Sequence, residues 1–218
     1  DYTDFDDACF GNDFDDTAWN NATTFGKGGV APWNKLYLSE TGTIAFDDIK
    51  SFENNSDFVG TTTNVIKKIQ FNIGKNVQFT PYFKIKAKAG KRITFITDTF
   101  QGGYQRAPEN VYITTNGVQE FECPYWMSGS ALVLTLPAGV EIIDVGYRLS
   151  GYACYDLPGA FSSNDEKLNL LWQKSANSVL INMRDTYMDC PDRERAQWLG
   201  DGVMSAKIAH YLIGDKSY

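Results

Sequence analysis

The chain has 218 residues, a hydrophobic content of 43% and a formal net charge of −7 at pH 7. This length is enough for one large domain or two small ones with a packed core. The negative charge argues against a nucleic-acid partner, because phosphate binding needs clustered lysine and arginine. No apolar run approaches the roughly 20 residues of a membrane-spanning helix, so we also expect no membrane partner.

The reactive side chains narrow the chemistry further. His210 is the only histidine, which excludes most Ser–His and Cys–His mechanisms and any multi-histidine metal site. The cysteines form no CxxC pair, so they indicate no metal–thiolate site and leave disulfides open. These cysteines are Cys9, Cys123, Cys154 and Cys190. Carboxylates remain as the best acid–base groups, and the sequence implies no cofactor.

Residues 1–60 are rich in Asp, Asn, Gly and Thr around short apolar islands. We expect irregular structure and short strands here, as the end of a preceding β-sandwich or a linker. The aspartates between Asp4 and Asp16 suggest calcium, but the EF-hand spacing with its glycine and closing glutamate is absent. A solvated acidic loop is the better interpretation, and we predict no metal site.

From about residue 64 to 149 the apolar residues recur with a period of two, which is typical of strands with one buried face. Short strands at regular spacing with Gly-rich turns favour an antiparallel β-sandwich over residues 61–157. The alternating residues are Ile69, Phe71 and Ile73, then Phe83, Ile85 and Ala87, then Ile93, Phe95 and Thr97.

Two turn signals predict hairpins within this region. Asn116-Gly117 separates the runs 111–115 and 118–122 and favours a tight turn whose twist matches a hairpin. Pro137-Ala138-Gly139 separates two further apolar runs, 131–136 and 140–149, and predicts another strand pair.

After Tyr155 the period changes to 3.6, which predicts helices over residues 158–218. Ser163 and Glu166 have the spacing of a capping box at the start of a helix from about 164 to 185. Its predicted apolar stripe is Leu168, Leu171, Trp172, Ser175, Val179 and Met183.

A second helix is predicted from roughly 197 to 213, with Gly214 as its C-terminal stop. Its predicted buried side is Met204, Ile208, Tyr211 and Leu212. The sequence therefore predicts a mainly β chain, an antiparallel β-sandwich followed by a C-terminal helical part.

The segment Asp189–Asp201, with the sequence DCPDRERAQWLGD, packs four carboxylates, two arginines and a tryptophan into thirteen residues. Glycoside cleavage needs an acid for the leaving oxygen and a second carboxylate. If the second helix extends back to Pro191, then Glu194, Trp198 and Asp201 share one face. Trp198 would then form an apolar wall beside Glu194, whose burial would raise its pKa.

Two alternatives remain open at this point. The neighbouring Arg193 and Arg195 would depress the pKa of Glu194 if they point toward it, and the sequence does not fix the sign. The charges would also suit a plain arginine–carboxylate cluster that caps the second helix.

The pattern Asp-Cys-Pro-x-Arg-Glu-Arg-x-x-Trp-x-Gly-Asp resembles the signature of the bacterial α-L-rhamnosidases, which are inverting glycoside hydrolases with a six-hairpin α/α barrel. The resemblance covers residues 144–201, while residues 60–143 resemble the adjoining sandwich in pattern only. It implies hydrolysis of terminal α-L-rhamnosyl groups with inversion and makes Glu194 the general acid. The implied substrate-binding residues are Asp189, Arg193, Trp198 and Asp201.

The resemblance also implies what surrounds this chain. It makes residues 158–218 the first helices of a catalytic α/α barrel, which is incomplete here because two helices cannot bury both faces of an α/α ring. The general base of the family is a glutamate far downstream in the barrel, which no residue here represents, so the isolated chain is expected to be inactive. The implied partners are a rhamnose-containing carbohydrate and the remainder of the catalytic barrel. A secreted or periplasmic location is the corresponding expectation.

Two other functions fit parts of the sequence. One is a non-catalytic carbohydrate-binding or scaffolding sandwich that binds glycans through exposed Trp and Tyr side chains and has no need of Glu194. The other is a different α/α-barrel glycosidase or lyase, because the sugar preference would be set by parts of the barrel outside this chain.

Overall fold

The computed structural model describes residues 13–32, 34–36, 44–99, 110–152 and 158–214. The chain divides into two compact units, residues 1–39 and 40–218. The described residues of the first unit form turns, bends and irregular segments. The predicted domain boundaries at residues 60/61 and 157/158 stay predictions.

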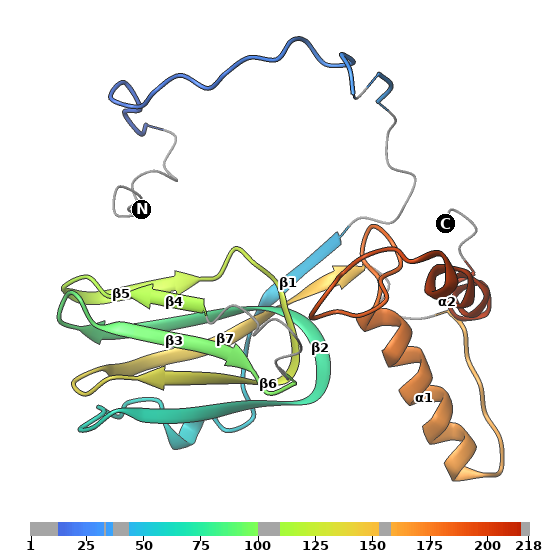
Figure 1. Ribbon diagram of the computed structural model, residues 1–218. Helices are drawn as coiled ribbons and strands as arrows, with labels where there is room; N and C mark the ends of the chain where they lie inside the picture. The colour runs from blue at the N-terminus through green and yellow to red at the C-terminus, as the bar shows by residue number, and fades with distance from the viewer. Residues whose placement is uncertain (1–12, 33, 37–43, 100–109, 153–157, 215–218) are drawn as a thin grey trace. The chain divides into compact units, whose positions relative to one another are not determined.

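The second unit is mainly antiparallel β with two helices at its C-terminal end, which confirms the predicted fold class (Figure 1). A short 3-10 turn, η2, spans Asn55–Asp57. The strands are β1 Ile44–Ser51, β2 Lys67–Ala87, β3 Arg92–Thr97, β4 Asn110–Ile113, β5 Gly117–Glu122, β6 Met127–Leu136 and β7 Glu141–Tyr152, and the helices are α1 Glu166–Ile181 and α2 Leu199–Leu212.

Strand β2 organises the sheet, because its 21 residues take part in both halves of it. Residues 67–79 pair with β6, while residues 79–86 pair with β7 and residues 82–87 with β5. The remaining pairs, β3 with β6 and β4, and β1 with β7, give the order β1-β7-β2-β6-β3-β4. Two strands predicted from the sequence are therefore one, and the sandwich is a single curved sheet in the form of a half-barrel.

Both predicted hairpins are wrong. Strand β4 pairs with β3 and strand β5 pairs with β2, so the chain crosses between strands at Asn116-Gly117 instead of doubling back. In the same way, β6 and β7 both pair with β2 but not with each other. The turn residues were identified correctly, since Gly117 has φ 93° and Gly139 has φ 76°, but local turn chemistry does not specify which strands pair.

Side-chain hydrogen bonds hold the crossing at Asn116 in place. The Ala89 amide donates to Asn116 Oδ1 at 3.0 Å, which ties the crossing to the turn after β2. Gln119 is buried; its Oε1 accepts from the Thr115 amide at 2.8 Å and its Nε2 donates to the Gly117 carbonyl at 3.0 Å. These bonds satisfy backbone groups that a two-stranded hairpin would have paired itself.

Substitution Gln119→Leu is expected to lower the free energy of unfolding by about 1–2 kcal/mol, because partly buried backbone groups lose their partners while side-chain volume is kept. Urea unfolding followed by circular dichroism measures the change. Gln173→Leu on the exposed side of α1 is the matched control and should change stability little. Equal stabilities for the two variants would contradict the role assigned to Gln119.

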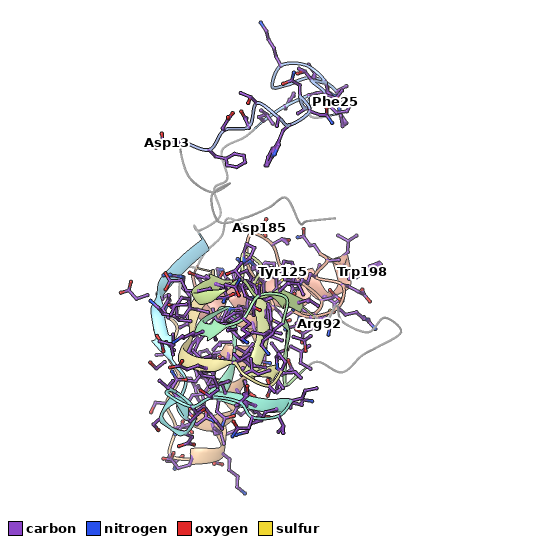
Figure 2. All side chains as sticks on the ribbon, turned by 90° about the vertical axis from the view of Figure 1, so that its left-hand side faces the viewer. Asp13, Phe25, Arg92, Tyr125, Asp185 and Trp198 are labelled. Carbon is purple, nitrogen blue, oxygen red and sulfur yellow. The ribbon has the colours of Figure 1, made fainter. Side chains whose placement is uncertain are left out.

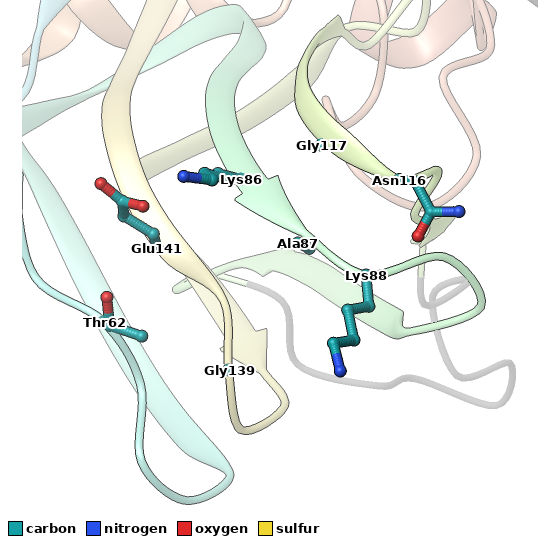
Figure 3. Close-up of a pocket in the computed structure, with 8 residues that line it drawn as sticks. All are labelled: Thr62, Lys86, Ala87, Lys88, Asn116, Gly117, Gly139 and Glu141. Atoms are coloured by element: carbon teal, nitrogen blue, oxygen red, sulfur yellow. The ribbon is translucent and has the colours of Figure 1, made fainter.

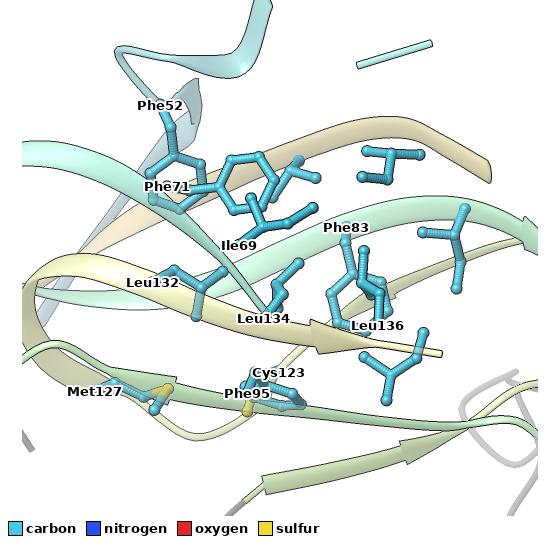
Figure 4. Packing of buried hydrophobic residues seen from close by; sticks show 14 of the residues in the cluster. Phe52, Ile69, Phe71, Phe83, Phe95, Cys123, Met127, Leu132, Leu134 and Leu136 are labelled. Atoms are coloured by element: carbon cyan, nitrogen blue, oxygen red, sulfur yellow. The ribbon is translucent and has the colours of Figure 1, made fainter. Parts of the chain in front are cut away.

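The core lies inside the curved sheet and is built from alternate residues of the strands (Figure 4). Phe71, Phe79, Phe83 and Leu132 are at most 1% exposed. The Phe83 ring lies 5.3 Å from the rings of both Tyr112 and Phe121, as measured between centroids. Burial of such residues is the main source of stability for the unit.

Helix α1 is shorter than predicted and is capped differently. The Lys167 amide donates to Asp165 Oδ1 at 2.8 Å, so Asp165 is the N-cap and the expected Ser163–Glu166 capping box does not form. The Ser163 amide donates instead to Asn169 Oδ1 at 2.8 Å. At its C-terminal end, α1 is tied to β2 by Gln78 Nε2, which donates to the Ile181 carbonyl at 2.8 Å.

The helices form a second small core, which includes Val179, Met183, Ala209 and Leu212. The predicted stripe is buried only at its C-terminal end, because each helix has few neighbours among the described residues. Five side chains predicted to be buried are 43–77% exposed: Leu168, Leu171, Met204, Ile208 and Tyr211. No described helix is sufficiently long and apolar to cross a bilayer.

Candidate functional site

The charged segment predicted as the site covers the second part of the loop between α1 and α2 and the first residues of α2. Apolar residues anchor the first part of this loop, since Met183, Tyr187 and Met188 are all buried. The Met188 amide donates to the Asn182 carbonyl at 2.6 Å and turns the chain back toward the end of α1. The loop residues that follow therefore start from a fixed position.

Asp189 closes the loop. Its amide donates to the Ala196 carbonyl at 3.0 Å, and its Oδ1 accepts from the Ala196 amide at 3.1 Å. Partial burial opposes ionisation of Asp189, but hydrogen bonds with Ala196, Cys190 and the Glu194 carboxyl outweigh it, so the pKa of Asp189 lies below its ordinary value of 3.8. Asp189 thus acts as an acceptor within its own loop.

Replacing Asp189 by alanine is expected to destabilise the protein by about 0.5–1.5 kcal/mol, because the Ala196 amide loses its acceptor. A carboxyl whose folded-state pKa is lowered adds stability above its ordinary value and loses it as the pH falls through the folded-state value. The melting temperature should therefore fall more steeply between pH 6 and pH 2.5 for the wild type than for Asp189→Ala. Asp185→Ala, at an exposed position in the same loop, should follow the wild-type profile; parallel profiles for all three proteins would contradict the account.

Glu194 stands at the surface of this loop with two side chains on its carboxylate. Trp198 Nε1 donates to Glu194 Oε2 at 2.6 Å, and Arg193 forms an ion pair with Oε1. The Glu194 amide donates to Cys190 Sγ at 3.2 Å. A third of the Glu194 side chain, 33%, is exposed, so an incoming ligand can reach it.

The helical arrangement predicted for these residues is wrong. Residues 191–194 form a turn, Arg195 has φ 52°, and α2 begins only at Leu199 with Trp198 as its extended N-cap. Glu194 and Trp198 meet through the loop and not through helical spacing. The predicted burial of Glu194 behind Trp198 is also wrong, because Trp198 is itself 56% exposed (Figure 2).

The loop brings four of the five predicted site residues together, namely Asp189, Arg193, Glu194 and Trp198. Asp201 lies in the first turn of α2 and is exposed. Among the described residues, no hydrogen bond or ion pair joins it to the other four. Whether these five residues act on a substrate stays a prediction.

Several residues that the sequence did not single out support the loop. Arg195 turns away from Glu194 and places its guanidinium over the Trp126 ring, 3.5 Å from the centroid. Asp192 accepts from the Thr99 hydroxyl at 3.3 Å, and burial raises its pKa. The one signal in the sequence that could have revealed these supporting contacts is the aromatic pair Tyr125-Trp126, which follows a predicted strand.

Two hollows among the described residues are lined by residues outside this loop. One pocket of about 330 Å³ is lined by Thr62, Lys86, Lys88, Asn116 and Glu141, among others (Figure 3). Another, of about 440 Å³, lies over Lys68, Gln70 and Asp98. Neither contains a residue of the Asp189–Asp201 segment.

The acidic and cysteine side chains bear on two further features, a metal site and disulfide bonds. No group of three or more His, Cys, Asp or Glu side chains in the described ranges is arranged to hold a metal ion. Asp4, Asp6 and Asp7, considered above for calcium, lie outside those ranges. Cys123 and Cys190 are free thiols, while Cys9 and Cys154 are not described.

Comparison with known proteins addresses the resemblance directly. Residues 156–218 match the family model of the bacterial alpha-L-rhamnosidase 6 hairpin glycosidase domain. The structure is similar to a GH78 family rhamnosidase of Bacillus sp. GL1, with a TM-score of 0.61 and 26% identity over 69% of this chain and 17% of that one. The resemblance to the bacterial α-L-rhamnosidases is confirmed.

Two further solved structures share the fold of this rhamnosidase-related chain. A rhamnosidase from Klebsiella oxytoca with rhamnose bound has a TM-score of 0.66 and 13% identity over 81% of this chain and 41% of that one. The α-L-rhamnosidase from Dictyoglumus thermophilum has a TM-score of 0.64 and 22% identity over 92% and 23%. No curated protein matches by sequence.

The rhamnosidase-related chain spans less than half the length of each of these solved structures, between 17% and 41%. The family model covers its helices and the candidate site, and the fold similarity extends over its sheet.

Proposed function

We propose that this chain is part of a glycoside hydrolase that removes terminal α-L-rhamnosyl residues with inversion of configuration. Glu194 is the general acid of the proposed reaction, and it protonates the glycosidic oxygen as the bond to the sugar breaks. The observation that carries the proposal is the cluster of Glu194 with Trp198, Arg193 and Asp189 at an accessible surface.

The cluster supports a separate role for each side chain. Trp198 already binds Glu194 through its indole N–H, and its exposed ring offers an apolar surface to a sugar. Arg193 is 63% exposed and is placed to bond a hydroxyl while it orients Glu194. Asp189 and Asp201 are proposed to accept bonds from sugar hydroxyls, Asp201 from the start of α2.

Inversion requires a second carboxylate that activates water on the opposite face of the sugar, roughly 6.5–9.5 Å from the acid. Asp189 is a poor candidate for this base because its carboxylate is bonded to Ala196 and lies against Glu194 itself. We therefore propose that the base lies in the remainder of an α/α barrel, and that the isolated chain is inactive.

The exposed apolar residues of the helices are consistent with a barrel that continues beyond them. Leu168 and Leu171 on α1, and Leu199, Val203 and Tyr211 on α2, are between 47% and 85% exposed. Exposed apolar side chains that gather in this way normally mark a surface that another element or protein covers. We also propose that the protein degrades rhamnose-containing polysaccharide and acts outside the cytoplasm.

Hydrolysis of an aryl α-L-rhamnoside by the full-length protein tests the proposed function. The anomeric configuration of the first sugar released, followed by proton NMR, tests inversion: β-L-rhamnose should appear first. The 218-residue chain alone should release none. A full-length protein that binds rhamnose-containing glycans but does not cleave them would support the carbohydrate-binding alternative, and cleavage of a different glycoside would support another α/α-barrel enzyme.

A further inference from the structure

A single tryptophan of the sheet contacts two arginines that flank the candidate site. Trp126 lies in the connection between β5 and β6, and the guanidinium carbons of Arg195 and Arg184 are 3.5 Å and 4.6 Å from its ring centroid. Arg195 Nη2 also donates to the Trp126 carbonyl at 3.2 Å. The ring and the backbone of one residue thus both bind Arg195.

Arg195 transmits this contact to the turn that carries Glu194. Its Nε donates to the Pro191 carbonyl at 2.8 Å, so the guanidinium joins the start of the turn to the sheet. Its backbone is left-handed, with φ 52°, a conformation that a non-glycine residue keeps only where its surroundings enforce it. With the Arg195 side chain bound to the sheet, the adjacent Glu194 side chain is directed toward Trp198.

Arg184 makes the other side of the contact rigid. It is 7% exposed, donates to Gln78 Oε1 on β2 at 2.8 Å, and donates to the hydroxyl of Ser150 on β7 at 3.1 Å. Trp126 therefore links the Glu194 turn to Arg184, which the adjacent strands β2 and β7 hold in place.

We propose that Trp126 is a positioning residue for Glu194, which acts by seating Arg195 and thereby fixing the turn at residues 191–194. The effect of this contact on catalysis rests on the proposed function above. Its effect on the conformation of residues 191–194 does not depend on that function.

Cys190 reports on the turn without any enzyme assay, because its Sγ accepts the Glu194 amide. Trypsin releases Cys190 within the peptide Asp185–Arg193, and the other cysteines fall on separate peptides. Iodoacetamide labelling of the folded full-length protein, followed by mass spectrometry, measures the rate at Cys190. In Trp126→Leu this rate should rise roughly tenfold as local opening of the turn becomes more populated.

Three comparisons separate positioning from general destabilisation. Trp126→Phe keeps an aromatic face for Arg195 and should restore most of the protection. Phe58→Leu removes a half-buried ring that packs on Phe71 in the core of the sheet, and should leave Cys190 labelling unchanged. Arg195→Lys leaves the sheet intact and should raise labelling as Trp126→Leu does. The buried Cys123 should stay protected throughout.

Unchanged Cys190 labelling in both Trp126→Leu and Arg195→Lys would overturn the proposal. If Cys123 becomes labelled in Trp126→Leu, that variant is generally destabilised. The Cys190 labelling of Arg195→Lys then decides whether the proposal holds. In the full-length protein, Trp126→Leu should lower kcat on an aryl α-L-rhamnoside, with recovery in Trp126→Phe. A wild-type protein without that activity, but with the expected labelling pattern, would contradict the proposed function and leave the positioning role intact.

Discussion

Glu194→Gln in the full-length protein is expected to lower kcat for phenyl α-L-rhamnoside, whose leaving group needs protonation, by roughly 10²–10⁴-fold, the range that general acid catalysis contributes. The glutamine amide has no proton of suitable acidity for the leaving oxygen. It keeps the shape of the side chain and an oxygen acceptor for Trp198 Nε1, which donates to Glu194 at 2.6 Å. Fold and substrate affinity should therefore change little.

Glu166→Gln is the matched control for this loss. Glu166 is an exposed glutamate at the first residue of α1, outside the loop that carries the site. Its substitution should leave kcat and KM near the wild-type values. A Glu194→Gln protein with wild-type kcat would show that Glu194 is not the acid, and an equal loss in both variants would point to a shared effect on folding.

The second large effect is expected in the core of the sheet. Phe83→Ala should lower the free energy of unfolding by about 3–5 kcal/mol, because it removes apolar burial and leaves a cavity. Phe83 is 1% exposed and its ring meets those of Phe95, Tyr112 and Phe121. These partners come from β3, β4 and β5, so the cavity would weaken contacts between both halves of the sheet.

Chemical denaturation measures this loss, with Phe25→Ala as the control. Phe25 is 88% exposed and belongs to the first unit, so its removal should cost little. Phe83→Leu should fall between the wild type and Phe83→Ala, since it retains part of the buried volume. A loss below about 1 kcal/mol for Phe83→Ala would contradict the assigned core, because large-to-small core changes cost more.

The sequence predicted the β class because alternation of apolar residues is a local property. Ile69, Phe71, Phe83 and Phe95 are all buried in the sheet as their spacing predicts. Strand pairing was not predictable in the same way, because Gly117 supplies the turn but not the partner of the strand that follows. The long strand β2 pairs with β5, β6 and β7, so the pairing depends on contacts between residues far apart in the sequence.

The candidate site shows the same division. The resemblance to the rhamnosidase signature singled out Glu194 and Trp198, and the structure places them in contact. The supporting residue Trp126 lies 69 positions before Arg195, and no local pattern reveals such a contact. The helix predicted back to Pro191 was wrong because hydrogen bonds of Asp189 and Arg195 hold a turn there instead.

Dependence on the leaving group tests most directly whether Glu194 donates the proton. The wild type and Glu194→Gln should be compared on a series of α-L-rhamnosides, from 2,4-dinitrophenyl, which departs without protonation, to alkyl. The account predicts near wild-type cleavage of the dinitrophenyl substrate by Glu194→Gln, and a loss that grows steadily as the leaving group becomes more basic. An equal loss on every substrate would contradict the assignment of Glu194 as the general acid.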